Sequence, residues 1–162
     1  MQAYNERQFQ QARMHLTHEM IHHAERIKKQ LGFGYEESMD APDTYEKLKA
    51  AYAHSCATGF ALPVYAGASD DTIYMTREGN WAFRFIHDIY HVFLDADFTI
   101  EGEYRVAEYH LDKIAKKFGK GSFEYRILAA DTIGQVEYFH SYGEFPLDQK
   151  KFVRDMIIGG VY

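Results

Sequence analysis

The sequence has almost no cysteine and no long apolar run, and both absences limit what the protein can be. A single cysteine, Cys56, among 162 residues rules out an internal disulfide and a cysteine-based zinc cluster. We expect Cys56 to be a small buried residue. No apolar stretch approaches the ~20 residues that span a bilayer. The segment from Met1 to Met14 has neither the apolar core of a signal peptide nor the acid-free composition of a transit peptide, so a cytoplasmic location is expected.

Positive charge is also scarce relative to negative charge. The net charge of −6 argues against a nucleic-acid partner, which normally requires a basic face on the protein. Apolar residues make up 46% and charged residues 26%, the balance of an ordinary globular protein. The length suits one domain, and we expect residues 1–162 to form it around one core. The sequence leaves open a peripheral contact with a membrane and a homo-oligomer.

Aromatic residues and histidines, in contrast, are abundant. Aromatic residues make up 16% of the chain, and there are nine histidines. Aromatics on this scale usually fill a bulky core, and they could also line a pocket for a flat or greasy ligand.

The apolar pattern predicts an all-α protein, a single-domain helical bundle. From Asn5 to Leu31, apolar residues recur at helical spacing, and two glycines then end the helix. Asp43 or Thr44 is the expected N-cap of the next helix. The later helices are expected at the following ranges: a second to about Thr58, then Asn80–Asp95, Ile100–Phe118, Phe123–Tyr142 and Asp148–Ile158.

Between the second and third of these helices, the stretch from Gly59 to Gly79 has the composition of a long loop. Loops of this length inside a domain are often functional. Convincing strand alternation is absent from the chain, although Leu62–Ala66 or Asp71–Met75 could be short extended pieces.

His87 and His91 are the first candidate metal ligands. They are four residues apart, which puts both imidazoles on one face of a helix, about one turn apart. At ~100° per residue they lie at the edge of the apolar arc of that helix, where a cavity would meet solvent. Two neutral imidazoles that converge there suit a divalent transition metal.

Glu103 is the third candidate, on the next helix. Eleven residues separate it from His91, and helices joined by so short a turn normally pack antiparallel, which brings the two side chains to the same level. Glu103 shares its helix face with apolar residues such as Ala107 and Ile114. Burying an unpaired carboxylate costs on the order of several kcal/mol, and a metal shared with the two histidines would provide its partner.

Asp88 is the fourth candidate. It lies ~100° round the helix from His87 and could bind the metal directly or hold a ligand in place. Two histidines with one or two carboxylates leave coordination positions open, which describes a catalytic site better than a closed structural one. The alternative is a pair of histidines at the rim of the core, with Glu103 paired to Arg84 or Arg105.

The string His87-Asp88-x-x-His91, followed by eleven residues and Glu103, resembles the signature of the coenzyme Q biosynthesis protein four family. The text Phe-Ile-His-Asp-Ile-Tyr-His-Val and the Glu-Gly-Glu that ends at Glu103 are similar as well, and the close resemblance covers roughly residues 83–118. The resemblance implies a helical protein that holds one divalent metal, usually zinc, through these four side chains. It also implies oxidative decarboxylation of the ubiquinone head-group ring at C1, association with other enzymes of that pathway, and binding of long isoprenoid lipids.

We therefore expect a metal-dependent enzyme of the lyase or hydroxylation type, acting on an aromatic or prenylated small molecule. The metal, zinc or iron, would act as a Lewis acid on a carboxylate or phenolate oxygen. One rival is an HD-type metal phosphohydrolase acting on nucleotides, which would use His54, His87, Asp88 and Asp131 in chain order. Another is a lipid-binding or scaffold module in which the metal is structural.

Several other polar residues are secondary candidates. His110 could support the metal site or shuttle protons, and a hydrogen-bonded core histidine is the alternative. Asp131 could face the metal cavity as an acid or base, or pair with a neighbouring Arg or Tyr. A further group, His15, His18 and His22 with Glu19, lies on a side of the first helix that we expect to be solvated. Two Glu-x-x-His strings, Glu19 to His22 and Glu137 to His140, match the pattern of di-iron helical bundles.

Overall fold

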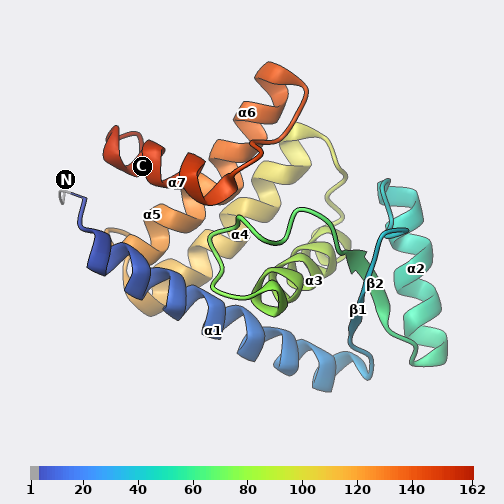
Figure 1. Ribbon diagram of the computed structural model, residues 1–162. Coiled ribbons are helices and arrows are strands. Elements are labelled where there is room, and N and C mark those ends of the chain that lie inside the picture. Colours follow the sequence, from blue (N-terminus) through green and yellow to red (C-terminus); the bar gives the residue numbers. More distant parts are fainter. Residues whose placement is uncertain (1–3) are drawn as a thin grey trace.

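The long first helix forms one side of the molecule in the computed structural model, which describes residues 4–162 (Figure 1). Residues 1–3 of the expected domain lie outside the described residues. Helix α1 (Glu6–Leu31) begins at Asn5, whose side chain accepts a hydrogen bond from the Gln8 backbone, and ends at Gly32 in the left-handed conformation. One face of α1 is buried against α3 and α5. The apolar residues of that face are Phe9, Ala12, Leu16, Met20, Ala24 and Ile27.

Helices α3 (Arg77–Phe93) and α4 (Ile100–Phe118) form the hairpin at the centre of the fold. Helix α3 begins earlier than predicted, because the Thr76 hydroxyl accepts from the Gly79 backbone and caps the helix there. It ends at Phe93, and Asp95 then takes a positive φ of 46° in the turn. Thr99 caps α4 in the same way as Thr76 caps α3. The short connection makes the two helices neighbours, as predicted.

The helix predicted over 123–142 is interrupted in the structure. Helix α5 (Phe123–Ala129) continues into a π-helical turn, η1 (Ala130–Gly134), and then into α6 (Gln135–Tyr142). The Thr132 hydroxyl donates to the Leu128 carbonyl, a side-chain bond that competes with the backbone pattern. Single-turn π insertions are rare and occur frequently at functional sites. Helix α7 (Gln149–Ile158) then packs against η1 and α5.

A small parallel sheet and one helix lie at one end of the molecule, and α7 lies at the opposite end (Figure 1). Strand β1 (Tyr35–Ser38) pairs with β2 (Leu62–Tyr65), and α2 (Tyr45–Thr58) connects them, capped by Thr44. The extended piece predicted at Leu62–Ala66 is therefore a strand, whereas β1 was not predicted and Asp71–Met75 forms no strand. The prediction of a mostly helical protein is confirmed.

The buried apolar side chains form one cluster that connects the helices with the sheet. Phe85, on α3, is fully buried and contacts the rings of Phe33 and Tyr35. The prediction for Cys56 is wrong, since this residue is exposed on α2. On that short helix Leu48 and Ser55 are the buried residues, so Cys56 faces solvent instead.

Candidate metal centre

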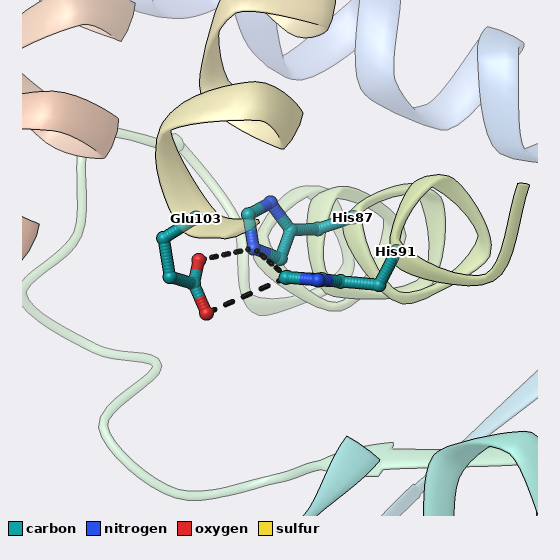
Figure 2. Close-up of side chains that lie close together, drawn as sticks. All are labelled: His87, His91 and Glu103. Atoms are coloured by element: carbon teal, nitrogen blue, oxygen red, sulfur yellow. Dashed lines mark hydrogen bonds and ion pairs between the residues drawn. The ribbon is translucent and has the colours of Figure 1, made fainter. Parts of the chain in front are cut away.

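His87 and His91 on α3 and Glu103 on α4 bring their ligand atoms together (Figure 2). Nε2 of His87 lies 3.1 Å from Oε2 of Glu103 and 3.1 Å from Nε2 of His91. Nε2 of His91 lies 3.4 Å from Oε1 of Glu103. The three residues predicted from spacing and helix faces are thus one cluster, and its geometry is that of a group that could hold one metal ion.

The separations between the side chains are close to the distance between neighbouring ligands of one metal ion. Bonds of about 2.0–2.1 Å from a zinc ion to nitrogen or oxygen place tetrahedral ligands about 3.3 Å apart. The imidazole nitrogens of His87 and His91 are 3.1 Å apart, and each lies near a different oxygen of Glu103, at 3.1 and 3.4 Å, distances that are close to that value. These side chains are therefore spaced to coordinate one small divalent ion and leave at least one position free for another ligand.

His91 is held in the tautomer that a metal ligand needs. It is fully buried, and its Nδ1 donates to the Ala96 carbonyl at 2.8 Å, so Nε2 is the nitrogen that faces His87 and Glu103 and is left for a metal ion. The ring of Phe98 packs edge-on against it. A backbone carbonyl that orients the second nitrogen of a ligating histidine is a common support in metal sites. The turn between α3 and α4 therefore sets the position of His91.

His87 is held by ring stacking. Its imidazole stacks on His110, with ring centroids 5.4 Å apart and planes 12° apart, and Phe83 contacts both rings. Among the described residues, neither His87 Nδ1 nor His110 Nε2 has a hydrogen-bond partner. Burial lowers the pKa of His110 well below its ordinary value, so this ring is neutral. His110 thus supports His87 by packing, and the alternative of a fully hydrogen-bonded core histidine is wrong for its Nε2.

The charges of the cluster stabilise one another. Burial raises the pKa of Glu103, but its hydrogen bonds to His87 and His91 outweigh burial, and the pKa lies well below its usual range. Burial lowers the pKa of His91, and the bond to Glu103 outweighs this effect, so the pKa is raised. Glu103 is therefore an anion at neutral pH, the state in which a carboxylate binds a cation.

The alternative pairing of Glu103 with an arginine is not observed. Arg84 instead donates to the backbone carbonyls of Gly67 and Ala68 and to that of Tyr65. Arg105 donates to the carbonyls of Leu94 and Asp95, in the turn after α3. Both guanidinium groups thus fix loops, which leaves Glu103 to the two histidines.

Asp88 is the one predicted ligand outside the three-residue cluster. It is half-buried on α3 beside His87. Burial raises the pKa of Asp88 to about 7, although His91 and Arg84 lower it. Asp88 lines the same cavity as His87, His91 and Glu103. Its role as a fourth ligand stays a prediction.

A cavity of about 740 Å³ adjoins the three ligands. This volume is within the range of sites for small molecules and cofactors. Asp88 and Asp131 contribute to its wall, and apolar side chains form much of the remainder. The apolar and aromatic members are Phe83, Phe98, Ile100, Ala107, Val136, Phe139, Phe145 and Leu147.

Asp131 is buried in η1 and faces this cavity. Its Oδ1 accepts from Gln135 Nε2 at 2.6 Å, so its partner is neither an Arg nor a Tyr. Burial raises the pKa of Asp131 to about 7, against the opposing effects of Gln135 and Arg84. Asp131 was an open candidate from the sequence, and its position in the wall places it in the site.

This raised pKa predicts a loss of stability as the pH rises. The folded chain holds the Asp131 proton up to about pH 7, whereas the unfolded chain releases it near pH 4, so the contribution is lost between these values. We expect Asp131→Asn to reduce the fall in unfolding free energy between pH 5 and pH 8 by roughly 2–3 kcal/mol. Urea unfolding at both pH values measures this difference. An equal fall in wild type and variant would contradict it, and exposed Asp112→Asn is the matched control.

The other candidate residues lie away from the cluster. His54 is exposed on α2 and contacts the ring of Phe60, so it does not join His87 and Asp88 as the phosphohydrolase hypothesis requires. His18 and His22 are exposed on α1, as predicted, and Glu137 is exposed on α6, so the described residues show no di-iron cluster.

The expected solvated side of α1 is in part an interface between helices. His15 Nδ1 lies 2.7 Å from the Glu124 carboxylate and stacks on Phe118. Glu19 pairs with Lys117 of α4 and with Arg26 of its own helix. These residues connect α1 to α4 and α5, and they form no metal site among the described residues.

Comparisons with protein-family models, curated proteins and solved structures find no match to this chain. No helix in the part of the chain that the structure describes is both long and apolar enough to cross a membrane.

Proposed function

We propose that this protein is a metal-dependent enzyme that acts on an aromatic or prenylated small molecule. The observation that carries the proposal is the position of the ligand cluster on the wall of a cavity. The ligand atoms of His87, His91 and Glu103 lie within 4.8 Å of one another, and the cavity beside them is large enough for a substrate. A metal with only a structural role would instead have its coordination positions filled by protein side chains.

The donor set is suited to zinc or iron. Two imidazoles and a carboxylate bind either ion. Asp88 is the proposed fourth ligand, and the substrate oxygen would then take a further position, as five- or six-coordinate ions allow. When bound, the ion supplies a Lewis acid that draws electron density from a carboxylate or phenolate oxygen of the substrate. The residues of the chain hold the ligands in place, and the apolar wall excludes water from the substrate.

The finer assignment rests on the aromatic character of the cavity and on the sequence resemblance. Phe83 and Phe98 lie beside the ligands, and Phe139 and Phe145 stack on each other in the same wall. A flat ring packs well against such side chains. The signature of the coenzyme Q biosynthesis protein four family at His87 to Glu103 supports decarboxylation or hydroxylation as the reaction type, with other enzymes of such a pathway as partners.

A lipid carrier with a metal is the second candidate, because apolar side chains of the cavity wall are also exposed. Leu147 is 99% exposed and Phe145 52%, and both belong to the segment after α6. Side chains of this kind could contact a chain that protrudes from the cavity. The phosphohydrolase hypothesis is less well supported, because His54, one of its required ligands, is exposed beside Phe60 and away from His87.

An activity screen on metal-loaded protein tests the proposed function. We expect substrate-dependent release of CO2 from benzoic acids with and without a prenyl chain, in air, with zinc or iron. Since the ligands are required, His91→Ala should reduce the rate at least about 100-fold, and the exposed control His54→Ala should retain it.

Two results would contradict this function. Hydrolysis of deoxynucleoside monophosphates, lost in His54→Ala, would favour the phosphohydrolase. A copurifying lipid without turnover of any aromatic acid would favour the carrier.

A further inference from the structure

Asp131 is a buried residue, and among the described residues its second oxygen, Oδ2, has no hydrogen-bond partner and is open to the cavity. Its side chain belongs to the cavity wall, and Oδ1 is held by Gln135 at 2.6 Å. Among the described residues, no cationic group lies within ion-pair distance of it. Burying a carboxyl group without such a partner is costly. A ligand in the cavity would provide the missing contact.

The helix that carries Asp131 presents one face to the cavity. Thr132, Gln135, Val136 and Phe139 lie on the same face as Asp131, across the π turn and the start of α6. Because the π turn changes the angular spacing of the residues around it, it determines which side chains of this helix meet the cavity. Asp131 and Gln135 are the members of this set that form a polar pair.

The charged and titratable groups around Asp131 come from several elements. Arg84 of α3 and Tyr74, just before α3, interact electrostatically with it. Asp88 of α3, Glu103 of α4 and His140 of α6 line the same cavity. Arg84 remains engaged by loop carbonyls and does not form an ion pair with Asp131. The carboxyl group is thus available to the cavity both as an acid and as an anion.

We propose that Asp131, oriented by Gln135, is the residue that selects substrates by a hydrogen bond to a hydroxyl group separate from the group that binds the metal. A hydroxyl group can donate to a carboxylate and accept from a carboxylic acid, so it fits both states of Asp131. A cation would fit only the ionised state, and an anion only the neutral state. This inference rests on the proposed function, and it defines the substrate class as a small molecule with a metal-binding oxygen group and a separate uncharged hydroxyl group.

Paired metal-binding probes test this selectivity in the full-length, zinc-loaded protein. The hydroxamate group is a general zinc ligand, and (hydroxymethyl)benzohydroxamic acid differs from ethylbenzohydroxamic acid by one hydroxyl group in place of a methyl. Meta and para isomers of both probes cover the two directions in which the substituent can point. Isothermal titration should give about 3- to 10-fold tighter binding of the hydroxymethyl probe, for at least one isomer. Asp131→Ala should abolish this preference, and exposed Asp112→Asn should retain it.

Infrared difference spectra provide a second readout that does not depend on the folding of Asp131→Ala. In wild-type protein, the hydroxymethyl probe should shift a carboxyl or carboxylate band that is absent from the spectrum of Asp131→Asn. The ethyl probe should leave that band in place, because it cannot form the hydrogen bond. Absence of the shift would overturn the proposal.

The outcomes separate the two levels of inference. Zinc-dependent binding of both probes, with no hydroxyl preference or with the preference kept in Asp131→Ala, overturns the role of Asp131 alone. Binding that is the same with and without zinc, and the same in His91→Ala, contradicts the metal site on which the proposed function depends.

Discussion

Purified protein should contain about one zinc or iron ion per chain, and replacing His91 or Glu103 by alanine should reduce this to below about 0.1. The reason is geometric, because the two imidazole nitrogens lie 3.1 Å apart and each lies within 3.4 Å of an oxygen of Glu103, so each residue can supply one corner of the site. Removing one of the three residues leaves two of the clustered ligands, and we expect that Asp88, the proposed fourth ligand, does not compensate for the loss during purification. Elemental analysis by mass spectrometry gives the content directly.

Matched controls separate loss of a ligand from loss of a charge or a ring. His54→Ala removes an exposed histidine from α2, and Glu137→Ala removes an exposed carboxylate from α6. Both should keep the full metal content. Since His91→Ala leaves a hole in a buried position, Glu103→Gln is the milder second variant, with its shape retained and its charge removed. Full metal content in both His91→Ala and Glu103→Gln would show that the metal does not bind at this site.

Phe85→Ala should have the largest effect on stability, a loss of about 3–5 kcal/mol in the free energy of unfolding. Phe85 is fully buried, and its ring lies between α3 and the residues at and before β1, where it contacts Phe33 and Tyr35. Truncation removes this apolar area and leaves a cavity that the helix and the sheet cannot close without moving apart. Chemical unfolding monitored by circular dichroism measures the change.

Phe93→Ala is the control for this prediction. Phe93 lies on the same helix but is 58% exposed, so its removal should cost less than about 1 kcal/mol. Equal losses in the two variants would show that the core does not depend on Phe85. The metal content of Phe93→Ala should stay near that of the wild type, because its ring is not part of the cavity wall.

The candidate site could be predicted from the sequence because the positions of its ligands follow from the geometry of helices. The four-residue spacing of His87 and His91 fixes them on one face, and the short turn before α4 brings Glu103 to them. Local rules sufficed for these three residues. The tautomer of His91 could not be predicted, since it depends on the carbonyl of Ala96, which the turn places beside the ring.

Other features escaped prediction for physical reasons. Strand β1 has a burial pattern without clear alternation, and it exists because β2, distant in sequence, pairs with it. The π turn at Ala130–Gly134 is only five residues long and lies between two α-helical segments, so a single helix was predicted there. Cys56 was judged from its residue type, whereas the orientation of α2 decided its exposure.

The compact spacing of the ligands has a consequence for how the chain folds. His87 and Glu103 are only sixteen residues apart, and one helical hairpin contains the entire cluster. Closing so short a loop has a small entropic cost, and contacts that are local in sequence can form early. A metal ion captured by this hairpin during synthesis would hold α3 and α4 together before α7 has left the ribosome. Metal supply would then influence the yield of folded protein as well as its activity.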